Sequence, residues 1–388
     1  MDAWFGWRDV LICVGRLHVN VVTGKKLVEA FYGREYTKSY YLGCSQGGRQ
    51  GVHATEVYPR DFDGVIAGCP ALNANYLSSW RASFYPITGP YNAKGFIQDT
   101  TWQGLIHSEI LRQCDGLDGV MDGIIEDPTL CQFRPEALLC ATATMINNTQ
   151  CLSAAQVNIV RKVFSPLYGE QGQLIYPGLQ PGAEVPASDK LLNGKPYLFS
   201  QDWFRYVVYS DPDWDSASFT IHDATVADEL NPFNIRTWPT SLANFRDTGG
   251  KLIMYHGGTD TQITGYNTEV FYDRLSVGMN TPSQALDSWY RFFRISGMYH
   301  CNGGPGAWSF GQGGAAAVGV DFDPKYNVLA AMVDWVENDT APETIEGTKF
   351  VNDTVALGVA FQRRHCRYPL RNTYVGGNYT QPDSWQCM

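Results

Sequence analysis

The chain has 388 residues, of which 44% are hydrophobic and 18% are charged, and its formal net charge is −10. This hydrophobic content is enough for a sizeable buried core and excludes wholesale disorder. The acidic balance argues against a nucleic-acid-binding protein, because contacts to phosphate need clustered Lys and Arg. No run of about 18 uninterrupted apolar residues occurs, so the sequence predicts no membrane-spanning helix. At about 100–200 residues per domain, the length favours two domains, or one large domain with an insertion.

The cysteines and the glycosylation sequons indicate an oxidising, extracellular environment. The ten cysteines are an even number, and no Cys-x-x-Cys pattern points to zinc or to redox exchange. Asn-x-Ser/Thr sequons begin at Asn147, Asn338, Asn352 and Asn378. The N-terminus is acidic, however, where a signal peptide has basic residues, and residues 8–9 (Arg-Asp) break its apolar run before it reaches the length of the apolar region of a signal peptide. We therefore expect a secreted type of protein, and the N-terminal residues predict no signal peptide in this chain.

The N-terminal part of the chain shows the alternation of helices and strands that is typical of a parallel α/β sheet. Apolar residues at helical spacing predict a helix over residues 25–32, and short apolar runs predict strands over residues 39–43 and 64–67. Between these strands, residues 47–58 predict a second helix that is ended by Pro59. Helices and strands of these lengths in this order predict a parallel sheet.

Residues 71–245 interrupt this pattern. They are rich in Trp, Tyr, Pro, Gly and Asp and show short helical patches, which predicts an inserted, lid-like domain. Its aromatic side chains, Trp203 among them, could stack on a phenolic ring, but most are expected to form the core of that domain. The α/β pattern returns afterwards, with a strand expected over residues 251–256 and helices over residues 268–275, 283–294 and 326–337. The predicted architecture is an α/β sheet in two parts, residues 1–70 and 246–388, separated by the insertion.

The first motif that indicates chemistry is Gly-x-Ser-x-Gly at residues 43–47 (Gly-Cys-Ser-Gln-Gly). In α/β hydrolases this motif forms a tight turn between a strand and a helix, and the turn exposes the serine hydroxyl above the sheet. The predicted strand before the motif and the predicted helix after it provide that context. The alternative is a glycine-rich turn with an incidental serine. We predict that Ser45 is a nucleophile.

A serine nucleophile needs a base and an orienting acid, which follow in the order Asp and then His on this fold. Asp260 lies just past the strand predicted at residues 251–256, at the edge where α/β catalytic residues collect. His300 follows a strand-like run and opens a glycine-rich loop, so it is the expected base. The competing candidates are Asp247 and Asp287, expected to be solvated carboxylates, and His365, expected to have a structural role at the surface.

Two cysteines flank these candidate residues. Cys44 precedes Ser45 and Cys301 follows His300. A disulfide between them would hold the serine and the histidine within hydrogen-bond reach, and such cross-links contribute about 2–4 kcal/mol to stability. The alternative is that Cys44 is a buried free thiol, which is common for cysteine.

A second constellation lies between Cys114 and Cys131. Asp115, Asp118 and Asp122 alternate there with glycines. Hard oxygen donors at short spacing on a tightly turning backbone suit Ca²⁺, and three such aspartates would repel one another without a cation. The loop is not an EF-hand, because the twelfth position counted from Asp118 is threonine rather than glutamate. The alternative is an acidic surface turn. We predict a structural calcium ion.

Three segments together resemble the tannase and feruloyl esterase family. They are residues 43–51 (Gly-Cys-Ser-Gln-Gly-Gly-Arg-Gln-Gly), residues 256–260 (His-Gly-Gly-Thr-Asp) and residues 298–306 (Met-Tyr-His-Cys-Asn-Gly-Gly-Pro-Gly). The likeness extends from about residue 20 to the end of the chain. It implies that Ser45 is the nucleophile, that Asp260 orients the base and that His300 is the general base.

The resemblance also implies the disulfides, the calcium ligands and the reaction. The implied pairs are Cys44–Cys301, Cys114–Cys131, Cys140–Cys151 and Cys366–Cys387, with Cys13 and Cys69 left over. The implied calcium ligands are the carboxylates of Asp115, Asp118 and Asp122 and the backbone carbonyls of Val120 and Ile124. The expected activity is a serine carboxylesterase acting on small-molecule or plant-polymer esters of aromatic acids such as ferulate or gallate, with the backbone N–H of Gln46 stabilising the oxyanion.

Two alternatives remain open at this point. Another α/β-hydrolase, such as a lipase or a peptidase, is disfavoured by the cysteine pair that flanks Ser45 and His300. The second alternative is a truncated, calcium-stabilised fragment with weak or no activity. It is motivated by the early position of Ser45, because about 45 residues supply only one strand and one helix before the nucleophile. We therefore expect an α/β-hydrolase sheet that is incomplete on its N-terminal side.

Overall fold

A computed structural model describes residues 15–141 and 150–388 of the chain. Its main sheet has four parallel strands in the order β1-β2-β5-β6, with β1 (Tyr40–Cys44), β2 (Gly64–Gly68), β5 (Lys251–Gly257) and β6 (Tyr290–Ile295). The predicted parallel α/β sheet is therefore confirmed. Strand β1 lies at the edge of this sheet, and no described strand pairs with its other side.

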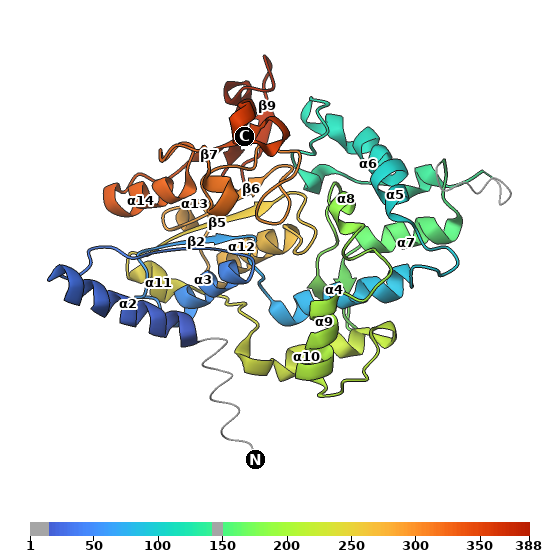
Figure 1. Ribbon diagram of the computed structural model, residues 1–388, viewed down its shortest axis with the longest axis horizontal. Helices are drawn as coiled ribbons and strands as arrows, with labels where there is room; N and C mark the ends of the chain where they lie inside the picture. Colours follow the sequence, from blue (N-terminus) through green and yellow to red (C-terminus); the bar gives the residue numbers. More distant parts are fainter. Residues whose placement is uncertain (1–14, 142–149) are drawn as a thin grey trace.

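Helices cover both faces of the sheet (Figure 1). On one face lie α2 (Arg16–Tyr32), α3 (Gln46–Val57), α11 (Ala243–Asp247) and α12 (Tyr266–Gly278), and on the other lies α14 (Val328–Asn338). Side chains alternate between the faces as a strand requires, so Val65 packs with the first group while its neighbour Ile66 packs with α14. Helix α2 buries none of its residues.

The segment predicted as a helix over residues 283–294 has a different structure. Only a short helix, α13 (Ser283–Leu286), forms there, and β6 follows it in parallel pairing with β5. The residues of β6 are buried on both faces of the sheet apart from Arg294, which is half-buried. Because a strand buried on both faces has no alternation of apolar and polar residues, its sequence looks like part of a buried helix.

The insertion between β2 and β5 packs beside the sheet around its own hydrophobic cluster, which includes Trp80, Trp102 and Phe204 (Figure 1). Helix α7 (Ala154–Phe164) begins with a capping box, in which the Ser153 and Gln156 side chains each accept a hydrogen bond from the other's backbone N–H. The regular elements of the insertion are α4 (Ala74–Thr88), α5 (Asp99–Thr101), α6 (His107–Cys114), α7 (Ala154–Phe164), β3 (Leu167–Tyr168), β4 (Leu174–Tyr176), α8 (Glu184–Ala187), α9 (Leu198–Asp202) and α10 (Ile221–Leu230).

The C-terminal residues form two antiparallel strand pairs that the sequence analysis does not predict. Strand β7 (Thr344–Phe350) pairs with β8 (Val359–Cys366), and β9 (Asn372–Tyr374) pairs with β10 (Trp385–Cys387). No helix in the described residues combines the length and the apolar character needed to cross a membrane.

Candidate active site

The turn between β1 and α3 holds Ser45 in an unusual backbone conformation. Its φ of 63° and ψ of −119° lie outside the regions that non-glycine residues usually occupy. The Ser45 N–H donates to the carbonyl of Gly68 in β2 (2.9 Å), which ties the turn to the sheet. Gly48 allows the close approach of α3, because a Cβ there would lie 2.4 Å from the same carbonyl oxygen. Ser45 thus stands at the carboxyl end of a parallel strand, where the motif predicts a nucleophile.

Asp260, which is fully buried, and His300, which is half-buried, form an acid–base pair. His300 Nδ1 lies 2.7 Å from Asp260 Oδ2, and the N–H groups of Gln262 and Ile263 donate to Asp260 Oδ1 at 2.8 and 3.0 Å. His256 Nε2 lies 3.2 Å from Oδ2. Burial alone would raise the pKa of Asp260, but the two histidines hold its pKa well below the ordinary value. Asp260 is therefore an ionised acceptor that fixes the orientation of the His300 ring.

A disulfide joins the two halves of this site. Cys44, just before Ser45, is bonded to Cys301, just after His300, with a Cα–Cα distance of 6.2 Å. The other three implied disulfides, Cys114–Cys131, Cys140–Cys151 and Cys366–Cys387, are also present. Cys69 is a buried free thiol, and Cys13 lies outside the described residues. The four implied pairings are confirmed.

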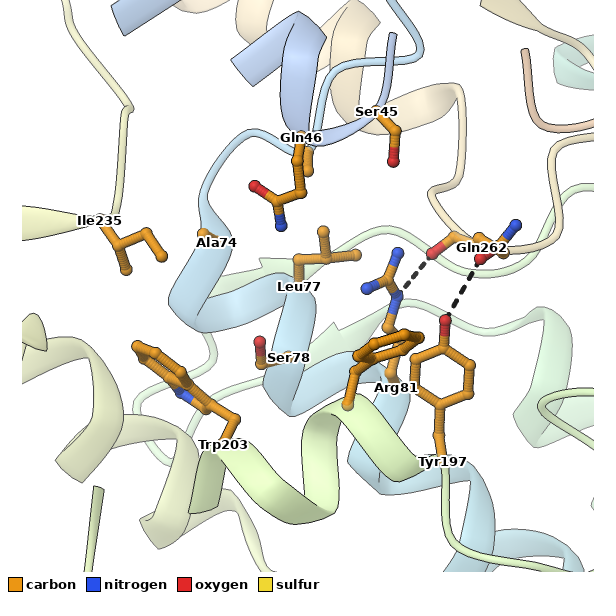
Figure 2. Close-up of a pocket in the computed structure, with 12 residues that line it drawn as sticks. Ser45, Gln46, Ala74, Leu77, Ser78, Arg81, Tyr197, Trp203, Ile235 and Gln262 are labelled. Atoms are coloured by element: carbon orange, nitrogen blue, oxygen red, sulfur yellow. Dashed lines mark hydrogen bonds between the residues drawn. The ribbon is translucent and has the colours of Figure 1, made fainter. Parts of the chain in front are cut away.

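Ser45 opens into a pocket of about 390 Å³ between the sheet and the insertion (Figure 2). The pocket has an apolar end with Ala74, Ile235 and Trp203 and a polar end with Arg81, Tyr197 and Gln262 (Figure 2). Its remaining lining residues are Gln46, Ala71, Leu77, Ser78 and Phe199. Within the described residues the Ser45 hydroxyl forms no hydrogen bond to His300, so the contact between nucleophile and base stays a prediction. Catalytic contacts often tighten only when substrate binds.

Comparison with known proteins identifies the family of the chain. The family model for tannase and feruloyl esterase matches residues 15–388. The chain belongs to this family. It is accordingly a carboxylic ester hydrolase, as the sequence motifs predict.

Relatives within the family are identical to this chain at about half of the aligned residues. A probable feruloyl esterase B-2 of Aspergillus flavus is 57% identical over 368 residues, which cover 95% of this chain and 68% of the relative. A probable feruloyl esterase B-2 of Aspergillus oryzae is 51% identical, with 96% of this chain and 70% of the relative covered.

Solved structures show the same fold. A crystal structure of feruloyl esterase B from Aspergillus oryzae is 46% identical with a TM-score of 0.92, covering 96% of this chain and 74% of that one. An esterase from the same organism is 50% identical with a TM-score of 0.93, covering 97% and 74%. A tannin acyl hydrolase from Aspergillus niger shares the fold at 21% identity and a TM-score of 0.72, over 95% of this chain and 68% of that one.

Of the competing candidates for the acid and the base, only Asp247 lies in the surroundings that the sequence predicts. Asp247 is exposed on α11, as expected. Asp287 is not a solvated carboxylate, because it is buried and pairs with Arg367. The prediction that His365 lies at the surface is also wrong. His365 is fully buried in β8, its Nε2 lies 2.9 Å from the carbonyl of Ala307, and burial lowers its pKa to about 4.

Several pocket residues were not predicted from the sequence. Arg81 comes from α4, Tyr197 precedes α9 and Gln262 follows Asp260, so no local motif contains them together. Trp203, one of the aromatic residues that could stack on a phenolic ring, is half-buried, packs against the core of the insertion and lines the pocket. The turn between Asp260 and Ile263 offers one sequence signal for a pocket residue. This turn lies just past a parallel strand, at the edge of the sheet where ligands bind.

The aspartate loop of this family member contains a carboxylate oxygen without a partner. Asp118 Oδ2 is buried and accepts no hydrogen bond within the described residues, and burial raises the pKa of Asp118 to about 7. Asp115 accepts from the N–H of Gly123 (3.0 Å), and Asp122 pairs with Arg363 (2.7 Å). Arg363 reaches the loop from β8, and no sequence signal linked them. Asp115 is buried and Asp118 and Asp122 are half-buried, whereas Leu117 and Met121 in the same loop are exposed.

Proposed function

We propose that the chain hydrolyses esters of hydroxycinnamic or gallic acid through an acyl-enzyme formed on Ser45. One observation carries this proposal. Ser45 stands on a strained turn that opens into a pocket, and a disulfide ties that turn to the loop whose His300 is held by ionised Asp260. The names of the relatives, feruloyl esterase B among them, favour an aromatic acid as the acyl group.

In the acylation step, Oγ of Ser45 bonds to the ester carbonyl carbon while His300 takes the hydroxyl proton. The carbonyl oxygen becomes an oxyanion, which accepts a hydrogen bond from the N–H of Gln46 at the start of α3. The bond between carbon and the alcohol oxygen then breaks, and His300 returns the proton to that oxygen. Asp260 accepts from His300 Nδ1 throughout and stabilises the imidazolium.

In the deacylation step, His300 takes a proton from a water molecule as the water oxygen adds to the acyl carbon. The bond to Ser45 Oγ breaks, the proton passes to Oγ, and the aromatic acid leaves with an oxygen from water. The apolar end of the pocket, with Ala74, Ile235 and Trp203, suits the flat aromatic ring of the acyl group.

We further propose that the aspartate loop binds a structural calcium ion. The carboxylates of Asp115, Asp118 and Asp122 and the carbonyls of Val120 and Ile124 would hold it. The unpartnered oxygen of Asp118 supports this proposal, because a buried carboxylate oxygen without a donor is costly. When bound, calcium supplies the positive charge that these carboxylates need in a partly buried loop.

We also propose that the protein is a secreted glycoprotein that acts on small-molecule or plant-polymer esters. Four disulfides favour an oxidising compartment. The sequon residues Asn338, Asn352 and Asn378 are exposed, as glycan attachment requires, and Asn147 lies outside the described residues.

The decisive experiment measures the release of free acid from methyl ferulate and methyl gallate by the purified chain. We expect Ser45-dependent hydrolysis of at least one ester, with activity lost in Ser45→Ala. The exposed Ser218→Ala change is the matched control and should retain activity. Absence of Ser45-dependent hydrolysis of either ester would contradict the proposal and favour the alternative of a calcium-stabilised, catalytically weak fragment.

A further inference from the structure

Arg81 places a positive charge in the pocket without a carboxylate to balance it. The side chain is half-buried, and no described residue forms an ion pair with it. Arg363, by contrast, is buried and forms ion pairs with Asp122 and Glu126. Arg81 is also the single charged residue among those that line the pocket. Because withdrawing a cation from water is costly, an unbalanced guanidinium in a pocket points to an anionic ligand.

The guanidinium is held in a fixed position. Its Nε donates to the carbonyl of Gln262 (2.7 Å), and it lies over the ring of Tyr197 at 5.2 Å from the centroid. The Tyr197 hydroxyl donates to the Gln262 side chain (3.2 Å). The two terminal nitrogens of Arg81 donate to no described protein atom, and Figure 2 shows the guanidinium directed into the pocket on the side of Ser45. A free, pre-oriented pair of donors is the geometry that binds a carboxylate through two hydrogen bonds.

The position of Gln262 relates Arg81 to the alcohol part of the substrate. The Gln262 N–H donates to Asp260 (2.8 Å), which in turn holds His300. In the proposed mechanism His300 protonates the departing alcohol, so the alcohol lies at the His300 side of Ser45. Arg81 and Gln262 occupy this polar end, whereas Ala74, Ile235 and Trp203 form the opposite, apolar end (Figure 2).

We propose that Arg81 binds a carboxylate on the alcohol part of the substrate, so that the enzyme prefers aromatic-acid esters of hydroxycarboxylic acids. This inference rests on the proposed function, because it uses the direction in which the alcohol leaves. A carboxylate is favoured over a phosphate because the pocket lining offers one positive charge, which a singly charged anion balances.

The test uses a matched pair of esters that differ in charge. One is the feruloyl ester of lactic acid, with a free carboxylate, and the other is the feruloyl ester of lactamide, which is neutral and of similar shape. We expect a higher kcat/KM for the lactate ester. In Arg81→Met the ratio of the two kcat/KM values should fall at least about tenfold, which corresponds to the loss of one hydrogen bond to a charged group. Arg81→Lys should retain part of the preference.

A second measurement does not depend on turnover. Calorimetry with the Ser45→Ala variant gives the Kd of each intact ester, and the lactate ester should bind more tightly only while Arg81 is present. The control Arg34→Met removes one exposed positive charge after α2. It should leave unchanged both the ratio of the two kcat/KM values and the ratio of the two Kd values. If hydrolysis is absent but this binding preference is found, the proposed function fails and the role of Arg81 stands.

Two outcomes would overturn the inference. One is that the parent chain and Arg81→Met prefer the lactate ester over the lactamide ester to the same extent while methyl ferulate is hydrolysed. That result would leave the proposed function intact. The other is that Arg81→Met changes the ratio of methyl ferulate to methyl cinnamate hydrolysis but leaves the lactate-to-lactamide ratio unchanged. In that case the guanidinium binds the oxygen substituents of the acyl ring instead of the alcohol part.

Discussion

Cys44 and Cys301 are joined by a disulfide across 257 positions of the sequence, and each is the immediate neighbour of a proposed catalytic residue. Cys44 precedes Ser45 in the turn before α3, and Cys301 follows His300. The bond therefore constrains the distance between nucleophile and base directly, whereas most disulfides act on the stability of the whole fold. Removal of this disulfide is expected to lower kcat by more than the accompanying loss of stability would explain.

The double variant Cys44→Ala/Cys301→Ala tests this expectation. We expect kcat for methyl ferulate to fall by about 100-fold, because a displacement of about 1 Å in a catalytic group can have that effect. The control is Cys366→Ala/Cys387→Ala, which removes a disulfide at the C-terminus and should lower Tm while retaining most of kcat. An equal loss of kcat in both double variants, measured well below their Tm, would contradict a positioning role.

Asp260→Asn should abolish most activity without unfolding the site. The amide oxygen can still accept from the N–H groups of Gln262 and Ile263, but the amide nitrogen cannot stabilise the imidazolium of His300. We expect kcat to fall by about 10³–10⁴-fold. Asp287→Asn is the matched control, because Asp287 is also buried but pairs with Arg367. A kcat in Asp260→Asn within tenfold of the parent value would argue against this acid.

Removal of calcium should lower Tm, and Asp118 should determine the size of the effect. In Asp118→Asn the buried oxygen is no longer part of a charged group, so we expect the chelated protein to be stabilised by about 1–3 kcal/mol. The same variant should lose the rise in Tm that Ca²⁺ produces in the parent chain. Asp321→Asn, in an exposed loop, should change neither value. A parent chain whose Tm is insensitive to chelator would contradict the calcium proposal.

The parts of the site that were predictable from the sequence lie in contiguous motifs. Ser45, Asp260 and His300 each stand beside a strand end or in a glycine-rich loop, so local patterns identify them, and the family resemblance supplied the cysteine pairs. The strand β6 was predicted as a helix because its residues are buried on both faces and show no alternation.

The parts that were not predictable depend on partners distant in the sequence. His365 and Asp287 are buried, and one polar atom of each has a partner distant in the sequence: the carbonyl of Ala307 for His365 Nε2 and the side chain of Arg367 for Asp287 Oδ2. Arg81 meets Gln262 only because α4 of the insertion lies against the turn after β5. No spacing rule connects such positions in a single sequence.

His53 should make the stability of the protein depend on pH. Burial, with a smaller effect of nearby Arg49, lowers its pKa to about 4, and neither ring nitrogen has a described partner. The unfolded chain binds a proton near the ordinary pKa of about 6.5, so between these two values the unfolded state carries more protons than the folded state. Stability is therefore full above about pH 6.5 and falls as the pH drops towards about 4.

The expected loss from this histidine is about 2 kcal/mol between pH 7 and pH 5. His53→Leu, which keeps a similar volume and cannot be protonated, should reduce the pH dependence of the free energy of unfolding by that amount. Urea unfolding at the two pH values measures it. His222→Gln, at an exposed position of α10, is the control and should leave the dependence unchanged. An identical dependence in His53→Leu and the parent chain would exclude this role.

Cys69 should be inert in the native protein although it lies beside a disulfide. Its sulfur and those of Cys44 and Cys301 lie within 4.8 Å of one another, and the residue is fully buried. Burial and the charge of Asp260 raise the pKa of the Cys69 thiol, which suppresses the thiolate that would attack the disulfide. Burial, with a further contribution from the carboxylate that orients His300, thus protects the disulfide beside the active site from exchange.

This protection predicts the rate at which a thiol reagent labels Cys69. In a Cys13→Ser background at pH 8, labelling of the native protein should be at least about a thousandfold slower than in denaturant, because it requires an opening of the core. Cys69→Ala in the same background identifies the labelled residue, since its denatured form should give no signal. Rapid labelling of the native chain, or a new disulfide between Cys69 and Cys44 found by peptide mapping after incubation at pH 8, would show that the thiol is accessible to exchange.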